Sequence, residues 1–104
     1  MALRLKLRPA ARSDAHAAQD WYDDAAPGLA EAFTEELLSV LSFLAARPSI
    51  GSRRYAHFLP DASLRVWPLD RFPFLVFYRV SGEVLDIVRI LHERRHIFAD
   101  LITH

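Results

Sequence analysis

The residue types that could do chemistry are gathered in the last third of the chain. His92 and His96 are the first and last residues of the string His-Glu-Arg-Arg-His. Two arginines, Arg65 and Arg79, lie in the strand-like runs before it. A histidine titrating near neutrality can transfer protons, and arginine can stabilise charge that develops on a phosphate. One interpretation is therefore RNA cleavage, with His92 as general acid and base and with Arg65 and Arg79 as phosphate clamps.

The same string matches the zinc-protease pattern His-Glu-x-x-His. That chemistry needs both histidines on one face of a helix and a further ligand downstream. His92 instead stands where a strand-like run ends, and no convincing third ligand follows. The chain contains no cysteine, which excludes thiolate sites. We therefore expect neither a metal nor another cofactor.

A third interpretation makes these residues a docking surface. A charge in an apolar strand is costly unless it meets water or an anionic partner, and arginines beside aromatic residues often anchor protein interfaces. The plain alternative is a solvated rim of salt bridges, for example between Arg79 and Asp86. The residues expected to contact a target are Arg65, Trp67, Tyr78, Arg79, Arg89, Arg94, Arg95 and His96.

Length and composition predict one globular domain spanning residues 1–104. The 104 residues are 52% hydrophobic and 25% charged, and no apolar run is long enough to cross a membrane. Without cysteine, a cytoplasmic location is the default expectation. The net charge is zero, but residues 10–46 carry seven acids against one base, whereas residues 47–104 carry nine arginines against six acids. This separation favours partners of both charge signs over bulk nucleic-acid binding.

Periodicity predicts two helices near the N-terminus. Alanines at intervals of three and four residues, after Pro9, predict a first helix with a narrow apolar stripe. Apolar residues at helical spacing predict a second helix from Leu29 to about Ala46, which ends before Pro48. Because Pro27-Gly28 separates the two, they should form an antiparallel helical hairpin.

Several large apolar residues need a separate interpretation. Trp21 and Tyr22 are expected to pack in the core of the helical hairpin. Leu38 and Phe43 lie off the main stripe of the second helix and predict a surface on which a partner helix packs. Phe58-Leu59 should anchor the long loop that follows the second helix.

The rest of the chain reads as strands. Alternation in Leu3–Arg8 predicts a half-buried strand, and three further runs follow at Ser63–Leu69, Phe72–Val80 and Val84–Leu91. The last two are apolar on both faces, so the helices should cover one face and the tail, Arg95–Ile102, or a partner the other. Helices followed by strands predict an α+β fold, a helical hairpin on a small, mainly antiparallel sheet in the order βααβββ with a short C-terminal helix or tail.

At this level the sequence resembles the ParE/RelE superfamily of toxins from type II toxin–antitoxin systems. The resemblance covers nearly the whole chain, and the order and spacing of its parts carry it. These parts are Pro9 and Ala11, Trp21-Tyr22, Ala30–Phe33, Leu44–Pro48, Pro48–Gly51, Arg65, Phe74–Val80 and Ile87–His92.

The resemblance implies a toxin that inhibits growth until an antitoxin neutralises it, in systems that stabilise plasmids or chromosomes. RelE-like members are ribosome-dependent mRNA endoribonucleases, whereas ParE-like members poison DNA gyrase without catalysis of their own. The Tyr78-Arg79 pair, the Leu91-His92 ending and the neutral charge favour the ParE branch, and the tail tyrosine of RelE has no match near Phe98.

Gyrase and an antitoxin are thus the expected partners, in a hetero-oligomer without a membrane. The antitoxin is expected to wrap the toxin as an extended helix and strand, with Leu38, Phe43 and Trp67 among its contacts. The alternatives are an endoribonuclease acting on ribosome-bound mRNA through His92, Arg65 and Arg79, or a non-toxic module that only binds its antitoxin.

Overall fold

The structure is a computed structural model, which describes residues 2–60 and 62–102. Its four strands form one open sheet in the order β1-β4-β3-β2, in which β1 runs parallel to β4 and the other pairs are antiparallel. The predicted α+β fold and the element order βααβββ are confirmed, as is the short C-terminal helix. The elements are β1 Arg4–Leu7, α1 Pro9–Ala25, α2 Leu29–Ala46, β2 Arg65–Pro68, β3 Phe74–Ser81, β4 Val84–His92 and α3 Ile97–Ile102.

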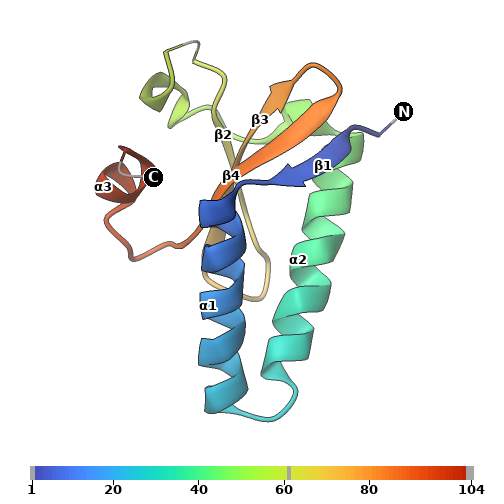
Figure 1. Ribbon diagram of the computed structural model, residues 1–104, viewed down its shortest axis with the longest axis vertical. Helices are drawn as coiled ribbons and strands as arrows, with labels where there is room; N and C mark the ends of the chain where they lie inside the picture. The colour runs from blue at the N-terminus through green and yellow to red at the C-terminus, as the bar shows by residue number, and fades with distance from the viewer. Residues whose placement is uncertain (1, 61, 103–104) are drawn as a thin grey trace.

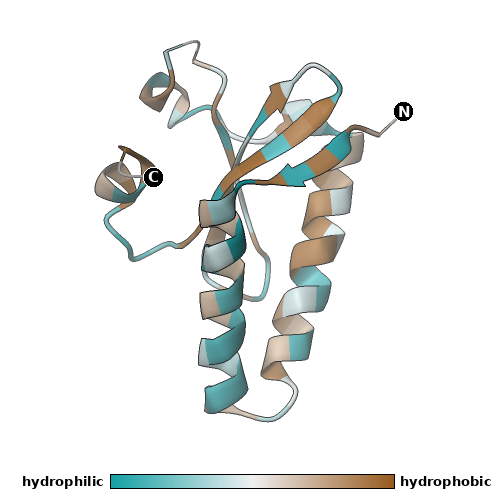
Figure 2. Cartoon of the chain, viewed as in Figure 1, coloured by the Kyte–Doolittle hydropathy of each residue, from teal (hydrophilic) through white to brown (hydrophobic). Residues whose placement is uncertain are grey.

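The helical hairpin covers one face of the sheet. Helices α1 and α2 run side by side and are joined at the end far from the sheet, as Figure 1 shows. Helix α1 contributes Ala11, Ala15 and Ala18 to the core, and these small side chains allow close packing. Helix α2 is apolar over much of its length, in contrast to the polar α1 (Figure 2). Together they bury the face of the sheet that carries Val76, Ile87 and Ile90.

An aromatic cluster closes this core toward the end of the hairpin where α1 and α2 are joined. The Tyr22 ring lies 5.4 Å from that of Phe33 and 4.9 Å from that of Phe72, centroid to centroid. Phe74 joins the same cluster, 5.3 Å from Phe33. Tyr22 is therefore a packing residue, as its sequence context predicts. Burial raises the pKa of its phenol above the ordinary value.

The chain itself covers the second face of the sheet. Val66, Phe77 and Val88 pack there against Tyr55, Phe58 and Leu59 of the loop before β2 and against Leu101 of α3. Phe58 and Leu59 thus anchor the loop as predicted. The loop also contains two short 3₁₀ turns, Pro48–Ile50 and Ala56–Phe58. The two-sided apolar strands therefore find their second cover within the chain, in this loop and in the tail.

Tight turns separate the strands at the positions that the sequence predicts. Gly82 adopts a φ of 60° between β3 and β4, a left-handed conformation that glycine enters without a steric penalty. Among residues 2–60 and 62–102, no helix has the length and apolarity that a membrane crossing needs.

Candidate docking surfaces

Tyr78 fastens the loop after α2 to the sheet from inside the core. Its side chain is fully buried, and its hydroxyl accepts a hydrogen bond from the Gly51 amide (2.9 Å) and donates one to the Pro48 carbonyl (2.8 Å). A β-carbon on Gly51 would lie only 2.9 Å from two ring carbons of Tyr78, so this approach requires glycine. Arg65 supports the same loop by donating to the carbonyls of Ser49 (3.0 Å) and Gly51 (2.9 Å).

Because Tyr78 is fully buried, its role is structural. Desolvation raises the pKa of its phenol, while the hydrogen bond from Gly51 and the charge of Arg65 act in the opposite direction. The sequence-based expectation that Tyr78 contacts a target does not agree with a fully buried ring. Arg65 is half-buried and holds backbone carbonyls.

Arg79 forms an ion pair with Asp86, which the sequence analysis gave as the alternative to a docking role. Its Nη1 lies 3.5 Å from Oδ2 of Asp86, and its Nε donates to the Ser63 hydroxyl (3.2 Å). Arg8 binds the same carboxylate more closely, with Nη2 donating to Oδ2 at 2.8 Å. Asp86 is buried, so these two arginines compensate a carboxylate that would otherwise be costly in the sheet.

Arg89 is an internal cation. Its Nε and Nη2 donate to the two carboxylate oxygens of Asp14 at 2.7 and 2.8 Å, and its Nη1 donates to the Asp100 carbonyl at 2.7 Å. The hydrogen bond to Asp14 raises the pKa of Arg89, against the effect of burial. Arg89 therefore cannot belong to an exposed docking surface in the folded chain, which corrects the sequence-based expectation.

His92 lies at the opposite end of the sheet from Arg79. In the antiparallel register of β3 and β4, His92 stands opposite Phe74 and Arg79 stands opposite Asp86. Phe74 and Arg79 are five positions apart on β3, about 17 Å at about 3.4 Å per residue. Arg65 pairs with Tyr78, which is next to Arg79 and four positions from Phe74, about 14 Å along the strand. The fold does not bring His92 and the two arginines around one phosphate.

The His-Glu-x-x-His string also lacks zinc-binding geometry. His92 ends β4, residues 93–95 form a turn and α3 begins only at Ile97, so the two histidines do not share a helical face. The His92 ring instead packs against that of Phe74 (5.2 Å), and its Nδ1 accepts the amide of Arg94 (3.1 Å). Within the described ranges, no three potential metal ligands gather in one place.

The remaining predicted target residues are exposed next to a groove. Arg94, Arg95 and His96 form the connection from β4 to α3 and face solvent. Beside them lies a groove of about 340 Å³, here called the Trp21 groove. The side chains that line it come from α1, β3, β4 and this connection: Asp14, Ala17, Ala18, Trp21, Tyr22, Phe74, Ile90, His92 and Arg95.

Trp21 corrects a second expectation. The sequence predicts a core position, but the side chain is 72% exposed, at the rim of the groove. Trp21 directly precedes the packed Tyr22 on a helix, where consecutive side chains point about 100° apart. The apolar character of Trp21 gives no sign that the side chain is exposed. The spacing of the three buried alanines does, because they define the inward face of α1 and Trp21 is not on that face.

A second exposed apolar surface, here called the α2 surface, consists of Leu38, Phe43 and Trp67. Leu38 is 57% and Phe43 37% exposed, and Trp67 is half-buried. The rings of Phe43 and Trp67 lie 5.5 Å apart, which joins α2 to β2. The three residues singled out for antitoxin contact thus lie on two neighbouring elements.

Comparison with known proteins identifies the family. The model of the ParE toxin of the type II toxin–antitoxin system parDE matches residues 5–97. The chain belongs to the ParE toxin family. It is also similar to a chain of the solved "Chromosomal ParDE TA system from P. aeruginosa", with 26% identity and a TM-score of 0.73. The match covers 88% of this chain and 96% of that chain. No curated protein matches the sequence.

The resemblance to the ParE branch is therefore confirmed, and the chain is a ParE-type toxin. Its fold agrees with that of the structural relative over most of both chains. The family match extends through β4 to the start of α3, and so includes the Trp21 groove and the α2 surface.

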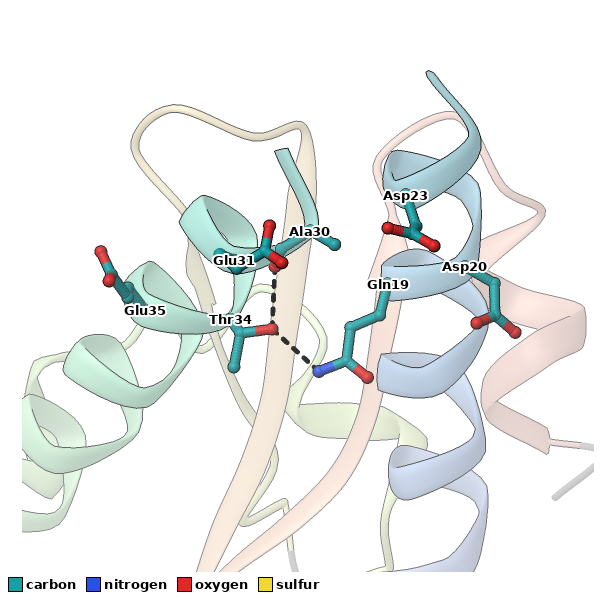
Figure 3. A pocket seen from close by; sticks show the side chains of 7 residues that line it. All are labelled: Gln19, Asp20, Asp23, Ala30, Glu31, Thr34 and Glu35. Carbon is teal, nitrogen blue, oxygen red and sulfur yellow. Dashed lines mark hydrogen bonds between the residues drawn. The ribbon is translucent and has the colours of Figure 1, made fainter. Parts of the chain in front are cut away.

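The ParE-type chain also has an acidic groove between α1 and α2, of about 440 Å³. Figure 3 shows Asp23 and Glu31 on the two helices that flank it, while Asp20 and Glu35 point away. The Gln19 amide nitrogen donates to the Thr34 hydroxyl (2.9 Å), which donates to the Ala30 carbonyl (2.9 Å), so these polar groups tie the helices together. The carboxylates that line this groove are exposed to solvent, as is usual on the polar face of a helix, and we assign no site here.

Proposed function

We propose that this ParE-type toxin arrests growth by binding DNA gyrase and trapping its cleavage complex, without catalysis by the toxin. The observation that carries the proposal is the distance of about 17 Å between His92 and Arg79 along the sheet, within a chain of the ParE family. A nuclease must place its proton-transfer group and its phosphate clamp on one substrate group. A docking toxin has no such requirement.

For the gyrase contact we propose the Trp21 groove and the exposed connection beside it. Arg94, Arg95 and His96 offer cations next to Trp21, which is the combination of residue types common at the centre of protein interfaces. Arg95 has its Nε 3.0 Å from Oδ2 of Asp100, but its side chain is still 53% exposed. Arg65 and Arg79 join the proposed contact less readily, because each holds a structural partner.

For neutralisation we propose that an antitoxin helix packs on the α2 surface. Leu38 and Phe43 are exposed apolar side chains on one helix, and Trp67 extends the patch onto β2. An amphipathic helix binds such a surface by burying apolar anchors at intervals of three to four residues. The toxin and its antitoxin would then form a hetero-oligomer.

The test asks whether the toxin stops DNA synthesis or translation first. We expect purified toxin to inhibit supercoiling by gyrase and to increase cleaved plasmid DNA, while cell-free translation continues. In growing bacteria, induction without antitoxin should lower thymidine incorporation before methionine incorporation. Early loss of translation with cleaved mRNA would instead favour the endoribonuclease, and no effect on either process would favour a module that only binds antitoxin.

A further inference from the structure

A hollow of about 440 Å³ lies where the loop after α2 meets the start of β2 and the end of β3. We call it the Arg53 pocket. Its lining includes Ser49 and Arg53 from the loop, Ser63 and Arg65 before and at the start of β2, and Val80 near the end of β3. The pocket shares no lining residue with the Trp21 groove, so it is a separate feature of the surface.

Contacts to the backbone hold both arginines of the pocket in place. Nη2 of Arg53 donates to the Ala62 carbonyl at 3.0 Å. Nη1 of Arg65 donates to the carbonyls of Ser49 (3.0 Å) and Gly51 (2.9 Å). These acceptors are neutral, so they fix the two guanidinium groups without cancelling their charges. The N–H groups of Nε and Nη2 of Arg65 have no acceptor among residues 2–60 and 62–102.

The charge of Arg65 lacks the compensation that the arginines of the next two strands have. Arg79 of β3 and Arg89 of β4 lie 3.5 and 2.7 Å from a carboxylate oxygen. Among the described residues, neither Arg65 nor Arg53 forms an ion pair, and no acid lines the pocket. Arg65 is half-buried, so its charge is partly desolvated at a cost in free energy. Two positive charges that border one hollow attract an anion.

The number of charges favours a doubly charged anion over a singly charged one. A phosphate monoester carries a charge of about −1.5 to −2 at neutral pH and has three strong acceptor oxygens, so it matches two guanidinium groups. Arginine binds phosphate through parallel N–H···O contacts. The volume of the pocket lies within the range of small-molecule sites, about 300–1,000 Å³. The pocket therefore also has room for the group that carries the phosphate, beside the apolar Pro48 and Val80.

We propose that the Arg53 pocket binds a phosphate dianion, either free or as a monoester such as a nucleoside monophosphate. The guanidinium groups of Arg53 and Arg65 bind the phosphate oxygens. Among the described residues, neither a histidine nor a carboxylate lines the pocket, so no group there transfers a proton at neutral pH. The phosphate is therefore bound and not cleaved. The site lies outside the proposed gyrase contact and does not depend on it.

The experiment titrates the full chain, labelled with nitrogen-15, in a phosphate-free buffer at constant ionic strength. The probes are inorganic phosphate, adenosine monophosphate and dimethyl phosphate, a diester with a single charge. We expect phosphate and adenosine monophosphate to shift the amide signals of Gly51, Arg53 and Ser63, with half-saturation at about 1 mM or below. Dimethyl phosphate should bind more weakly by about tenfold or more, because it offers one charge to two guanidinium groups.

Two pairs of variants test the pocket itself. Arg53→Gln should lower the affinity for phosphate by about tenfold or more, whereas Arg54→Gln, at the next exposed position and outside the lining, should bind within about threefold of the wild type. Val80→Glu places a carboxylate in the lining, and Val80→Gln has the same size without the charge. The Gln variant should bind phosphate more tightly than the Glu variant by about tenfold or more. Val80 is 39% exposed, so both changes are compatible with folding.

Oligonucleotides identify the source of the phosphate. A short DNA strand with a 5′-phosphate and the same strand without it differ by a single monoester. Binding of the phosphorylated strand alone, without a response to adenosine monophosphate, would assign the pocket to strand ends. Binding of adenosine monophosphate as tight as that of the phosphorylated strand would assign it to free monoesters. Both results support the phosphate dianion as the ligand.

Several results would overturn the proposal. These are unchanged signals at Gly51 and Arg53, equal affinity for dimethyl phosphate, equal binding of the unphosphorylated strand, and equal affinity of Arg53→Gln and Arg54→Gln for phosphate. The gyrase assay is separate: toxin that binds phosphate but does not inhibit gyrase refutes the target and leaves the pocket intact, and the reverse result does the opposite.

Discussion

Asp14 and Arg89, which are 75 residues apart in the sequence, form a bidentate ion pair that joins α1 to β4. The same carboxylate accepts the Ile90 amide (2.9 Å), and the same guanidinium donates to the Asp100 carbonyl in α3 (2.7 Å). The side chains of both residues are nearly buried, at 9% and 11% exposure. The pair therefore fixes the tail and one edge of the sheet to the helical hairpin.

Removing one partner of this pair should cost much more stability than removing both. We expect Asp14→Ala to lower the free energy of unfolding by about 3–5 kcal/mol, because it leaves the Arg89 charge buried without its carboxylate. In the double variant Asp14→Ala with Arg89→Leu, part of that loss should return, although the Ile90 amide still lacks its acceptor. Urea unfolding of the wild type and the two variants measures the three free energies, and a double variant no more stable than Asp14→Ala would contradict this account.

Stability should fall at alkaline pH through Tyr78. Its pKa is raised in the folded state, so its contribution is fully present below the ordinary phenol pKa of about 10 and is lost as pH rises through the folded-state value. Tyr78→Phe should cost about 1–2 kcal/mol at neutral pH, since two hydrogen bonds disappear. Above about pH 10, stability should decline less steeply in Tyr78→Phe than in the wild type. Parallel curves from denaturation at several pH values would show that Tyr78 is not responsible.

His92→Ala should leave growth arrest in place. The ring packs beside Phe74 and is remote from Arg65 and Arg79, so we expect supercoiling inhibition to weaken by no more than about tenfold, as for the loss of one contact. His16→Ala, which changes an exposed histidine on α1, is the matched control. Complete loss of toxicity for His92→Ala alone, together with mRNA cleavage by the wild type that this variant lacks, would favour the nuclease.

Leu38→Asp should free the toxin from its antitoxin. A charge placed in an apolar contact is desolvated without a partner, and we expect affinity to fall by about tenfold or more. Ser39→Asp adds the same charge at the neighbouring exposed position of α2 and should bind nearly as the wild type does. Growth rescue by co-expressed antitoxin, with affinity measured by calorimetry, compares the two. Equal rescue would place the antitoxin elsewhere.

The sequence by itself determined the elements and their order, because these depend on local physics. Helix α2 follows from its apolar period, its end from Pro48, and the β3–β4 turn from Gly82. The two-sided apolar strands likewise predicted a cover on each face of the sheet. The ParE family followed from the order of these parts, which the family model confirms over residues 5–97.

Only the tertiary structure decided the role of each charged and aromatic side chain. Arg89 and Tyr78 are residue types that often anchor interfaces at the surface. Here, hydrogen bonds to Asp14 and Gly51, which are distant in sequence, keep both side chains in the interior. Trp21 is a residue type common in cores, yet it is exposed, because the buried face of α1 is the one that carries Ala11, Ala15 and Ala18. An arginine is stable in the interior only where a carboxylate meets it, and that meeting depends on register and packing between distant segments, which no local pattern specifies.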